Sequence, residues 1–155
     1  MAEIEKKLTA EGIALPAVKA PIGNYVDVQI TGNLAFVSGK LPLKDDGSLL
    51  YTGKLGTEVN IDEGYAAAAL CARHILACLR NELGDLDKIR QVARVGGFVA
   101  AAEGFVDVPK VVNGASDLFV KVFGDAGRHA RAAVGVASLP LNAPVEIEAL
   151  IEVSV

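Results

Sequence analysis

Residues 129–153 read HARAAVGVASLPLNAPVEIEALIEV, and the second half of this stretch carries the clearest pattern in the chain. From position 145 to 153, every odd residue is apolar, and three of the four even residues are glutamate. Alternation with a period of two predicts a strand over 144–154, with one face in a core and the other accessible to water. The apolar run before it predicts a second, buried strand over 130–138, which ends at the Leu-Pro turn.

The rest of the chain carries both helix and strand signals. Apolar residues recur every three or four positions over 61–83, which predicts a long helix that Asn60 or Asp62 caps and Gly84 ends. A Gly-Asn turn between two alternating runs predicts a hairpin over 25–40. The other expected elements are a short helix at 2–11, a strand at 88–101 with a bulge at Gly96-Gly97, and a helix at 109–123.

The order ββ–α–β–α–ββ predicts an α+β fold. Strands mixed with two helices favour a two-layer sandwich, in which both helices pack on one face of one mixed sheet. A chain of 155 residues suits a single domain over 1–155.

The composition indicates self-association. Hydrophobic residues make up 52% of the chain, yet only 5% is aromatic and there is no Trp. Small aliphatic residues therefore supply more apolar surface than a soluble domain usually carries. A small domain often buries such an excess against copies of itself, so we expect a homo-oligomer.

Charge and hydropathy argue against other classes of protein. The net charge is −4, and no stripe of Lys and Arg with interleaved aromatics is visible, which argues against a nucleic-acid partner. No uncharged apolar span is long enough for a membrane helix, and the polar N-terminus lacks a signal-peptide core, so we expect a cytoplasmic protein without a membrane partner. Cys71 and Cys78 lie about 10 Å apart along the predicted helix, too far for a disulfide, and we interpret them as small buried residues.

Arg131 raises the main functional question, because it interrupts a run of small apolar residues. Arginine keeps its charge in proteins, and burying it without a partner is costly. Its head therefore reaches water or meets an anion, either one of the late glutamates or the carboxylate of a ligand. The planar guanidinium suits a bidentate clamp on a carboxylate, and the small Ala133 and Gly135 on the same face leave room for a small molecule.

Other polar residues have both a functional and a structural interpretation. His129 is two residues before Arg131, so both point to one side of the strand and together form a cationic wall, unless His129 simply faces solvent. Glu146 is a candidate for acid–base chemistry or an ordinary outward glutamate. Asn113 points away from the apolar face of its helix, as a solvated polar residue does. We interpret His74 as a structural residue.

Segments spread along the chain resemble motifs of one known family. The C-terminal stretch 129–153 matches a Pro-Ala-Arg…Leu-Pro…Val-Glu-Ile-Glu-Ala signature. The other matching segments are IGNY at 22–25, FVSGKLPL at 36–43, DDGSL at 45–49, LGDLDKI at 83–89 and VVNGASDLF at 111–119. Together they resemble the Rid (reactive intermediate deaminase) family, also called the YjgF or L-PSP endoribonuclease family.

The resemblance runs from about residue 20 to the C-terminus and leaves 1–20 as an N-terminal extension. His-Ala-Arg in place of Pro-Ala-Arg indicates a side branch of the family. The resemblance implies a chorismate-mutase-like, ferredoxin-like α+β fold, and a homotrimer with three clefts between subunits.

The resemblance also implies an activity, the hydrolytic deamination of 2-imino or enamine acids such as 2-iminopropionate. Arg131 would hold the substrate carboxylate, while Glu146 or backbone carbonyls help a water add to the imine carbon and release ammonia. No cofactor or metal is implied, because the protonated imine is itself the electrophile. Tyr25, Ser38, Gly39 and Asn113 match positions that line the cleft, and Lys40, His129 and Ala133 are further candidates for substrate binding.

Three positions depart from the family pattern. Asn24 replaces a proline, Lys40 a glutamine, and Ala133 a cysteine that many members carry. An added lysine near a carboxylate site, together with His129, suits a more anionic ligand. Two other hypotheses stay open, namely a trimer that binds a small carboxylate metabolite without turnover, and an endoribonuclease, against which the acidic charge argues.

Overall fold

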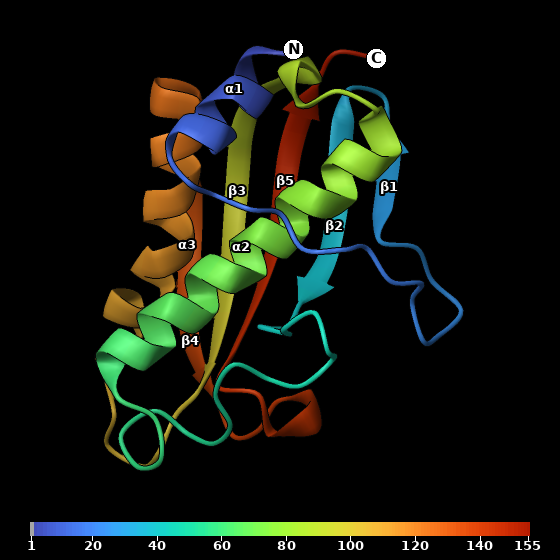
Figure 1. Cartoon of the computed structure of the whole chain (residues 1–155). Helices are drawn as coiled ribbons and strands as arrows, with labels where there is room; N and C mark the ends of the chain where they lie inside the picture. Colours follow the sequence, from blue (N-terminus) through green and yellow to red (C-terminus); the bar gives the residue numbers. More distant parts are fainter. Residues whose placement is uncertain (1) are drawn as a thin grey trace.

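The protein has two layers, a five-stranded sheet and a layer of helices on one side of it (Figure 1). The computed structural model describes residues 2–155. The helices are α1 (Glu3–Ala10), α2 (Ile61–Leu83) and α3 (Val108–Phe123). The strands are β1 (Val28–Thr31), β2 (Leu34–Lys40), β3 (Ile89–Ala100), β4 (Ala130–Val136) and β5 (Val145–Val153), and three 3₁₀ turns, η1 (Leu86–Lys88), η2 (Gly124–Gly127) and η3 (Pro140–Asn142), lie between them.

The sheet is mixed, with the strand order β1-β2-β5-β3-β4. Neighbouring strands run antiparallel except β3 and β4, which are parallel and are joined through α3. The predicted α+β sandwich and its element order are therefore confirmed, as is the hairpin of β1 and β2.

The predicted alternation of the last strand is confirmed. β5 lies at the centre of the sheet, and its five odd residues, from Val145 to Val153, are at most 7% exposed because they face the helices. Its even residues, Glu146, Glu148, Leu150 and Glu152, lie on the opposite face. No helix of residues 2–155 covers that face, and we call it the uncovered face (Figure 1).

The helix α2 begins and ends where the sequence predicts. Asn60 forms a capping box with Glu63, which satisfies free N–H groups of the first turn, and Gly84 ends the helix in the left-handed conformation at φ 74°. Twelve of its residues are buried, since α2 packs against both the sheet and α3. Cys71 and Cys78 are buried free thiols on this helix, as expected.

Two details of the predicted strands are wrong. β4 is an edge strand and mostly exposed, because its parallel pairing with β3 leaves its other edge free. Gly96 and Gly97 pair in regular register with β4 and β5, and the irregularities of β3 lie between Ile89 and Arg94. Gly97 is instead required because a Cβ there would lie 2.5 Å from the Val112 side chain.

The N-terminal residues pack on the body of the domain. The amides of Glu3 and Ile4 donate to the Asp87 carboxylate, which begins α1, and Leu8 is 3% exposed. Among residues 2–155, no helix is both long and apolar enough to cross a membrane.

Candidate functional site

The predicted site residues fall into two groups on opposite faces of the sheet. Asn113, His129, Arg131 and Ala133 lie on the helix side, between α3 and the edge strand β4. Tyr25, Ser38, Gly39 and Glu146 lie on or beside the uncovered face. We call these the arginine group and the glutamate group.

Arg131 is exposed and held by two neutral side chains of α3. Its Nη1 donates to Asn113 Oδ1 at 2.8 Å and to Ser116 Oγ at 3.1 Å. No Asp or Glu of residues 2–155 forms an ion pair with it. The sequence analysis offered either a late glutamate or a ligand carboxylate as the partner of Arg131. Within residues 2–155, no late glutamate takes that place.

His129 joins the arginine group through Ser116. Its Nδ1 lies 2.7 Å from the Gly127 carbonyl oxygen, and its Nε2 lies 2.8 Å from Ser116 Oγ. The imidazole also meets the buried Phe119 edge-on, with the ring centroids 6.1 Å apart. His129 and Arg131 thus point to the same side of β4, as the sequence predicts.

Glu146 lies against the backbone of Gly39. A Cβ at Gly39 would lie 2.5 Å from Glu146 Oε1, so only glycine allows the carboxyl group this close approach. Burial, and to a smaller extent the Glu148 carboxylate, raises the pKa of Glu146. A carboxyl group with a raised pKa can accept and return a proton nearer to neutral pH.

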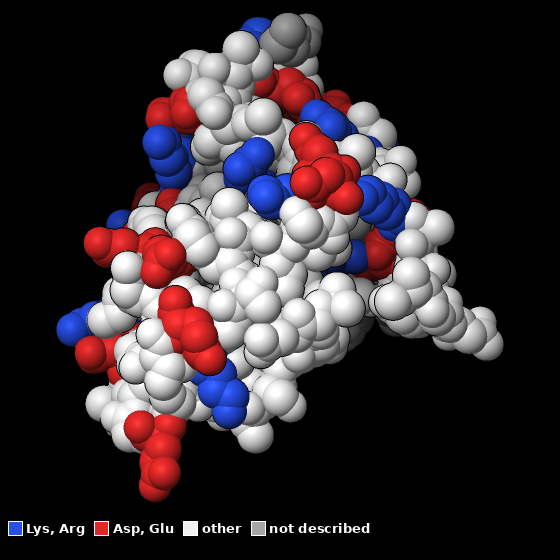
Figure 2. Space-filling view, turned by 60° about the horizontal axis from the view of Figure 1, so that its bottom comes forward, with Lys and Arg blue, Asp and Glu red and all other residues white. Residues whose placement is uncertain are grey.

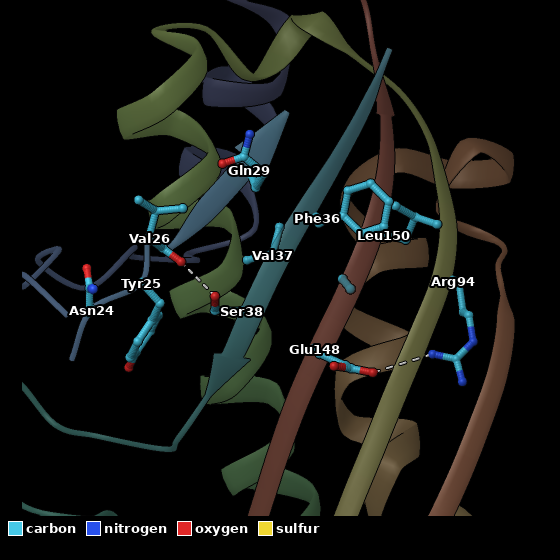
Figure 3. A pocket seen from close by; sticks show the side chains of 11 residues that line it. Asn24, Tyr25, Val26, Gln29, Phe36, Val37, Ser38, Arg94, Glu148 and Leu150 are labelled. Atoms are coloured by element: carbon cyan, nitrogen blue, oxygen red, sulfur yellow. Dashed lines mark hydrogen bonds and ion pairs between the residues drawn. The ribbon is translucent and has the colours of Figure 1, made fainter. Parts of the chain in front are cut away.

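Tyr25 and Ser38 line a groove of about 800 Å³ on the uncovered face (Figure 3). The Ser38 hydroxyl donates to the Val26 carbonyl at 2.7 Å and so ties the loop that carries Tyr25 to β2. On the other side of the groove, Arg94 forms an ion pair with Glu148 at 3.5 Å. The groove therefore combines apolar walls with polar groups.

Lys40 belongs to neither group. Its ammonium forms an ion pair with Asp27, and both side chains are less than one-fifth exposed. The charge of Lys40 acts on His74 and Cys78 of α2, which places it toward that helix. The structure thus gives Lys40 a partner of its own.

Two residues that contact the predicted site residues were not identified from the sequence. Ser116 contacts both Arg131 and His129, and its position three residues after Asn113, on the same helix face, was a usable signal. Asp27 as partner of Lys40 had no such signal. His74 donates to the Leu43 carbonyl at 2.7 Å, in keeping with a structural role. Within residues 2–155, no group of three or more His, Cys, Asp or Glu side chains could hold a metal ion.

The raised pKa of Glu146 predicts that Glu146→Gln increases the thermal stability by an amount that depends on pH. In the unfolded chain the Glu146 carboxyl group loses its proton at about pH 4.3, whereas in the folded chain it does so at a higher pH. Between these two values the unfolded state is favoured increasingly, so Glu146 lowers the free energy of unfolding as the pH rises. We expect the Gln variant to melt a few degrees above wild type at pH 7, with the gain vanishing near pH 4. Thermal unfolding at both pH values checks this, with Glu103→Gln at an exposed site as control. An equal gain at both pH values would contradict it.

Comparison with known proteins gives one consistent family. The chain matches, over residues 5–153, the model of a family described as "YjgF/chorismate_mutase-like, putative endoribonuclease". It is 46% identical to Protein TCP17 of Trypanosoma cruzi over 144 residues, 92% of this chain and 89% of that protein. The match to the crystal structure of the protein Atu1372 from Agrobacterium tumefaciens covers 98% of this chain and 92% of that chain, with 48% identity and a TM-score of 0.89. A 2-iminobutanoate/2-iminopropanoate deaminase of Dermatophagoides farinae is 26% identical over 139 residues, 90% of this chain and 93% of that protein.

Proposed function

The chain belongs to the YjgF/chorismate mutase-like family, and from this premise we propose that it hydrolyses 2-imino acids of the 2-iminopropionate type at clefts between its subunits. The relative from Dermatophagoides farinae that bears a 2-iminopropanoate deaminase name supports this reaction class.

The observation that carries the proposal is the state of Arg131. Its guanidinium is exposed, is held by two neutral acceptors, and has no carboxylate partner among residues 2–155. A fixed guanidinium without a counter-ion is a ready receptor for the carboxylate of a small ligand.

In the proposed reaction Arg131 binds the substrate carboxylate and Glu146 handles protons. Water adds to the C2 carbon of the protonated imine, and Glu146 accepts a proton from that water. Glu146 returns this proton to the nitrogen of the resulting carbinolamine. The C–N bond then breaks, the carbinolamine hydroxyl gives its proton to the departing ammonia, and ammonium and a 2-oxo acid leave. The raised pKa of Glu146 suits a group that takes and returns one proton per turnover.

For both groups to act on one ligand they have to come from different copies of the chain, as they would in the homotrimer that we propose. Arg131 faces α3 on one side of the sheet, whereas Glu146 lies on the other. The uncovered face exposes apolar side chains, among them Phe36 at 48% and Val134 at 46%. In the proposal, the β4 edge of one subunit, which carries the arginine group, packs against the uncovered face of the next subunit and so meets its glutamate group.

Phe36→Asp tests this assembly, because Phe36 lines the groove on the uncovered face. We expect wild type to sediment at three times 16.1 kDa and the variant at 16.1 kDa, since a charge would be buried in the interface. Analytical ultracentrifugation measures both. Val106→Asp, at an 81% exposed loop position, is the matched control. A wild-type monomer, or a variant that stays trimeric, would argue against assembly through this face.

The charge distribution argues against RNA as the substrate, despite the endoribonuclease in the family description. The net charge is −4, and the face shown in Figure 2 mixes acidic and basic side chains around an uncharged centre, without a continuous basic tract. An RNA-binding face needs such a tract to neutralise phosphates.

The direct test generates imino acids with an amino-acid oxidase and traps the surviving imine with semicarbazide. We expect wild type to lower the trapped amount for at least one small substrate, in proportion to enzyme. If no imino acid is consumed above the buffer rate while pyruvate still raises the melting temperature, the cleft binds carboxylates without turnover. If neither occurs, the proposed function is wrong.

A further inference from the structure

Ser116 and His129 form a hydrogen-bonded chain with Arg131 whose direction is fixed at both ends. Guanidinium N–H groups only donate, and a backbone carbonyl only accepts. Arg131 therefore donates to Ser116 at one end, and His129 Nδ1 donates to the Gly127 carbonyl at the other. In the neutral imidazole this leaves Nε2 as an acceptor, so the Ser116 hydroxyl donates to it at 2.8 Å.

We call this hydrogen-bonded series of Arg131, Ser116 and His129 the relay, and its members are themselves held in place. A Cβ on Gly127 would lie 2.2 Å from the Phe119 carbonyl oxygen, so the Gly127 backbone sits tightly against α3. Phe119 is fully buried and meets the His129 ring edge-on, which limits rotation of the imidazole. Asn113, Ser116 and Phe119 follow one another at intervals of three on α3, so one helix face presents the whole arrangement.

The contacts determine which edge of Arg131 stays free. The guanidinium has five N–H donors, and its Nη1 carries two of them. Asn113 Oδ1 and Ser116 Oγ use both, at 2.8 and 3.1 Å. Among residues 2–155 no other group accepts from the guanidinium, so the donors that remain are Nε–H and the two on Nη2. Of these, only the Nε–Nη2 edge offers two parallel donors to one carboxylate.

We propose that Ser116 and His129 are positioning residues that hold Arg131 so that it takes a ligand carboxylate side-on, through Nε and Nη2. This rests on the proposed function in one respect, the carboxylate ligand. A long arginine side chain loses rotamer freedom when it binds, and this relay removes part of that loss beforehand. The relay therefore sets substrate affinity rather than the chemical step.

Kinetics of matched variants test the relay. Ser116→Ala is expected to raise KM about tenfold, the order expected for losing one hydrogen bond to a charged group, while kcat stays within a factor of two. Ser116→Thr keeps the hydroxyl and is expected to restore the wild-type KM. His129→Phe keeps the ring packing on Phe119 and is expected to resemble Ser116→Ala, and the double variant is expected to be no worse than either single one. His74→Gln serves as control. Unchanged KM in the single variants, or multiplied effects in the double one, would overturn the relay.

Nitrogen NMR tests the geometry without turnover. The chain has two histidines, and the structure gives them opposite tautomers, Nδ1–H for His129 and Nε2–H for His74. His74→Gln assigns the two signals. On addition of pyruvate the Arg131 Nε–H resonance is expected to shift, whereas pyruvamide, which lacks the carboxylate, leaves it in place. An Nε2–H tautomer at His129 would overturn the relay, and pyruvate binding without a shift at Nε would overturn the side-on geometry.

The two failures can be told apart. If wild type neither hydrolyses imines nor binds pyruvate, the proposed function and the side-on carboxylate fail together. The histidine tautomers, and the NMR order of the Arg131 side chain compared between wild type and Ser116→Ala, then still decide whether the relay positions the guanidinium.

Discussion

Arg131→Ala is expected to lower kcat/KM for imine hydrolysis at least about a hundredfold, since a bidentate charged contact comprises two hydrogen bonds worth roughly 1.5–3 kcal/mol each. The loss should appear largely in KM, because Arg131 binds the carboxylate and does not touch the C–N bond that breaks. Arg131→Lys keeps the charge but not the planar fork, so we expect an intermediate loss. Steady-state kinetics across several imino acids measure all three proteins.

Stability separates this effect from unfolding. Arg131 is exposed and its partners are neutral, so the Ala variant should melt within a few degrees of wild type. Arg128→Ala is the matched control, because Arg128 lies close by on the chain and its side chain, within residues 2–155, forms only an exposed ion pair with Asp125. Its kcat/KM should stay within a factor of two. An active Arg131→Ala variant would remove the central element of the proposed mechanism.

Much of the fold could be predicted because its signals are local. The alternation in β5 and the capping residues of α2 depend on neighbours in the sequence, and both were placed correctly. The exposure of β4 depends on its position at the edge of the sheet, which the strand order decides. An apolar run looks the same in an edge strand and in a central one, so the burial of β4 was predicted wrongly.

The site shows the same division. Period two placed His129 and Arg131 on one side of their strand, since that relation is internal to the strand. Whether this side coincides with that of Glu146 depends on the pairing of β3 with both β4 and β5, which no local pattern contains. Ser116 and Gly127 entered the site through packing of α3 against the start of β4, again a tertiary relation.

The packing of α3 on α2 leads to the largest expected effect on stability. A Cβ at Gly114 would lie 2.0 Å from the Tyr65 carbonyl oxygen of α2, and a backbone atom cannot move aside as a side-chain tip can. Alanine normally stabilises a helix relative to glycine by about 1 kcal/mol. The clash must outweigh that gain, and forcing two packed helices apart costs about 1–3 kcal/mol or more.

Gly114→Ala is therefore expected to lower the melting temperature by about 2–12 °C, since a net loss of about 1–3 kcal/mol corresponds to 2–4 °C per kcal/mol for a chain of this size. Gly64→Ala is the matched control on the facing helix, where a Cβ would meet only side-chain tips of Leu55 and Val111 at 2.8 and 3.0 Å. The helix gain is the same there and the neighbours can adjust, so a smaller loss is expected. Calorimetry on both variants measures the difference. Because Gly114 follows Asn113, a shift of α3 should also loosen Arg131 and raise KM. A Gly114→Ala protein as stable as wild type would mean that the two helices do not approach this closely.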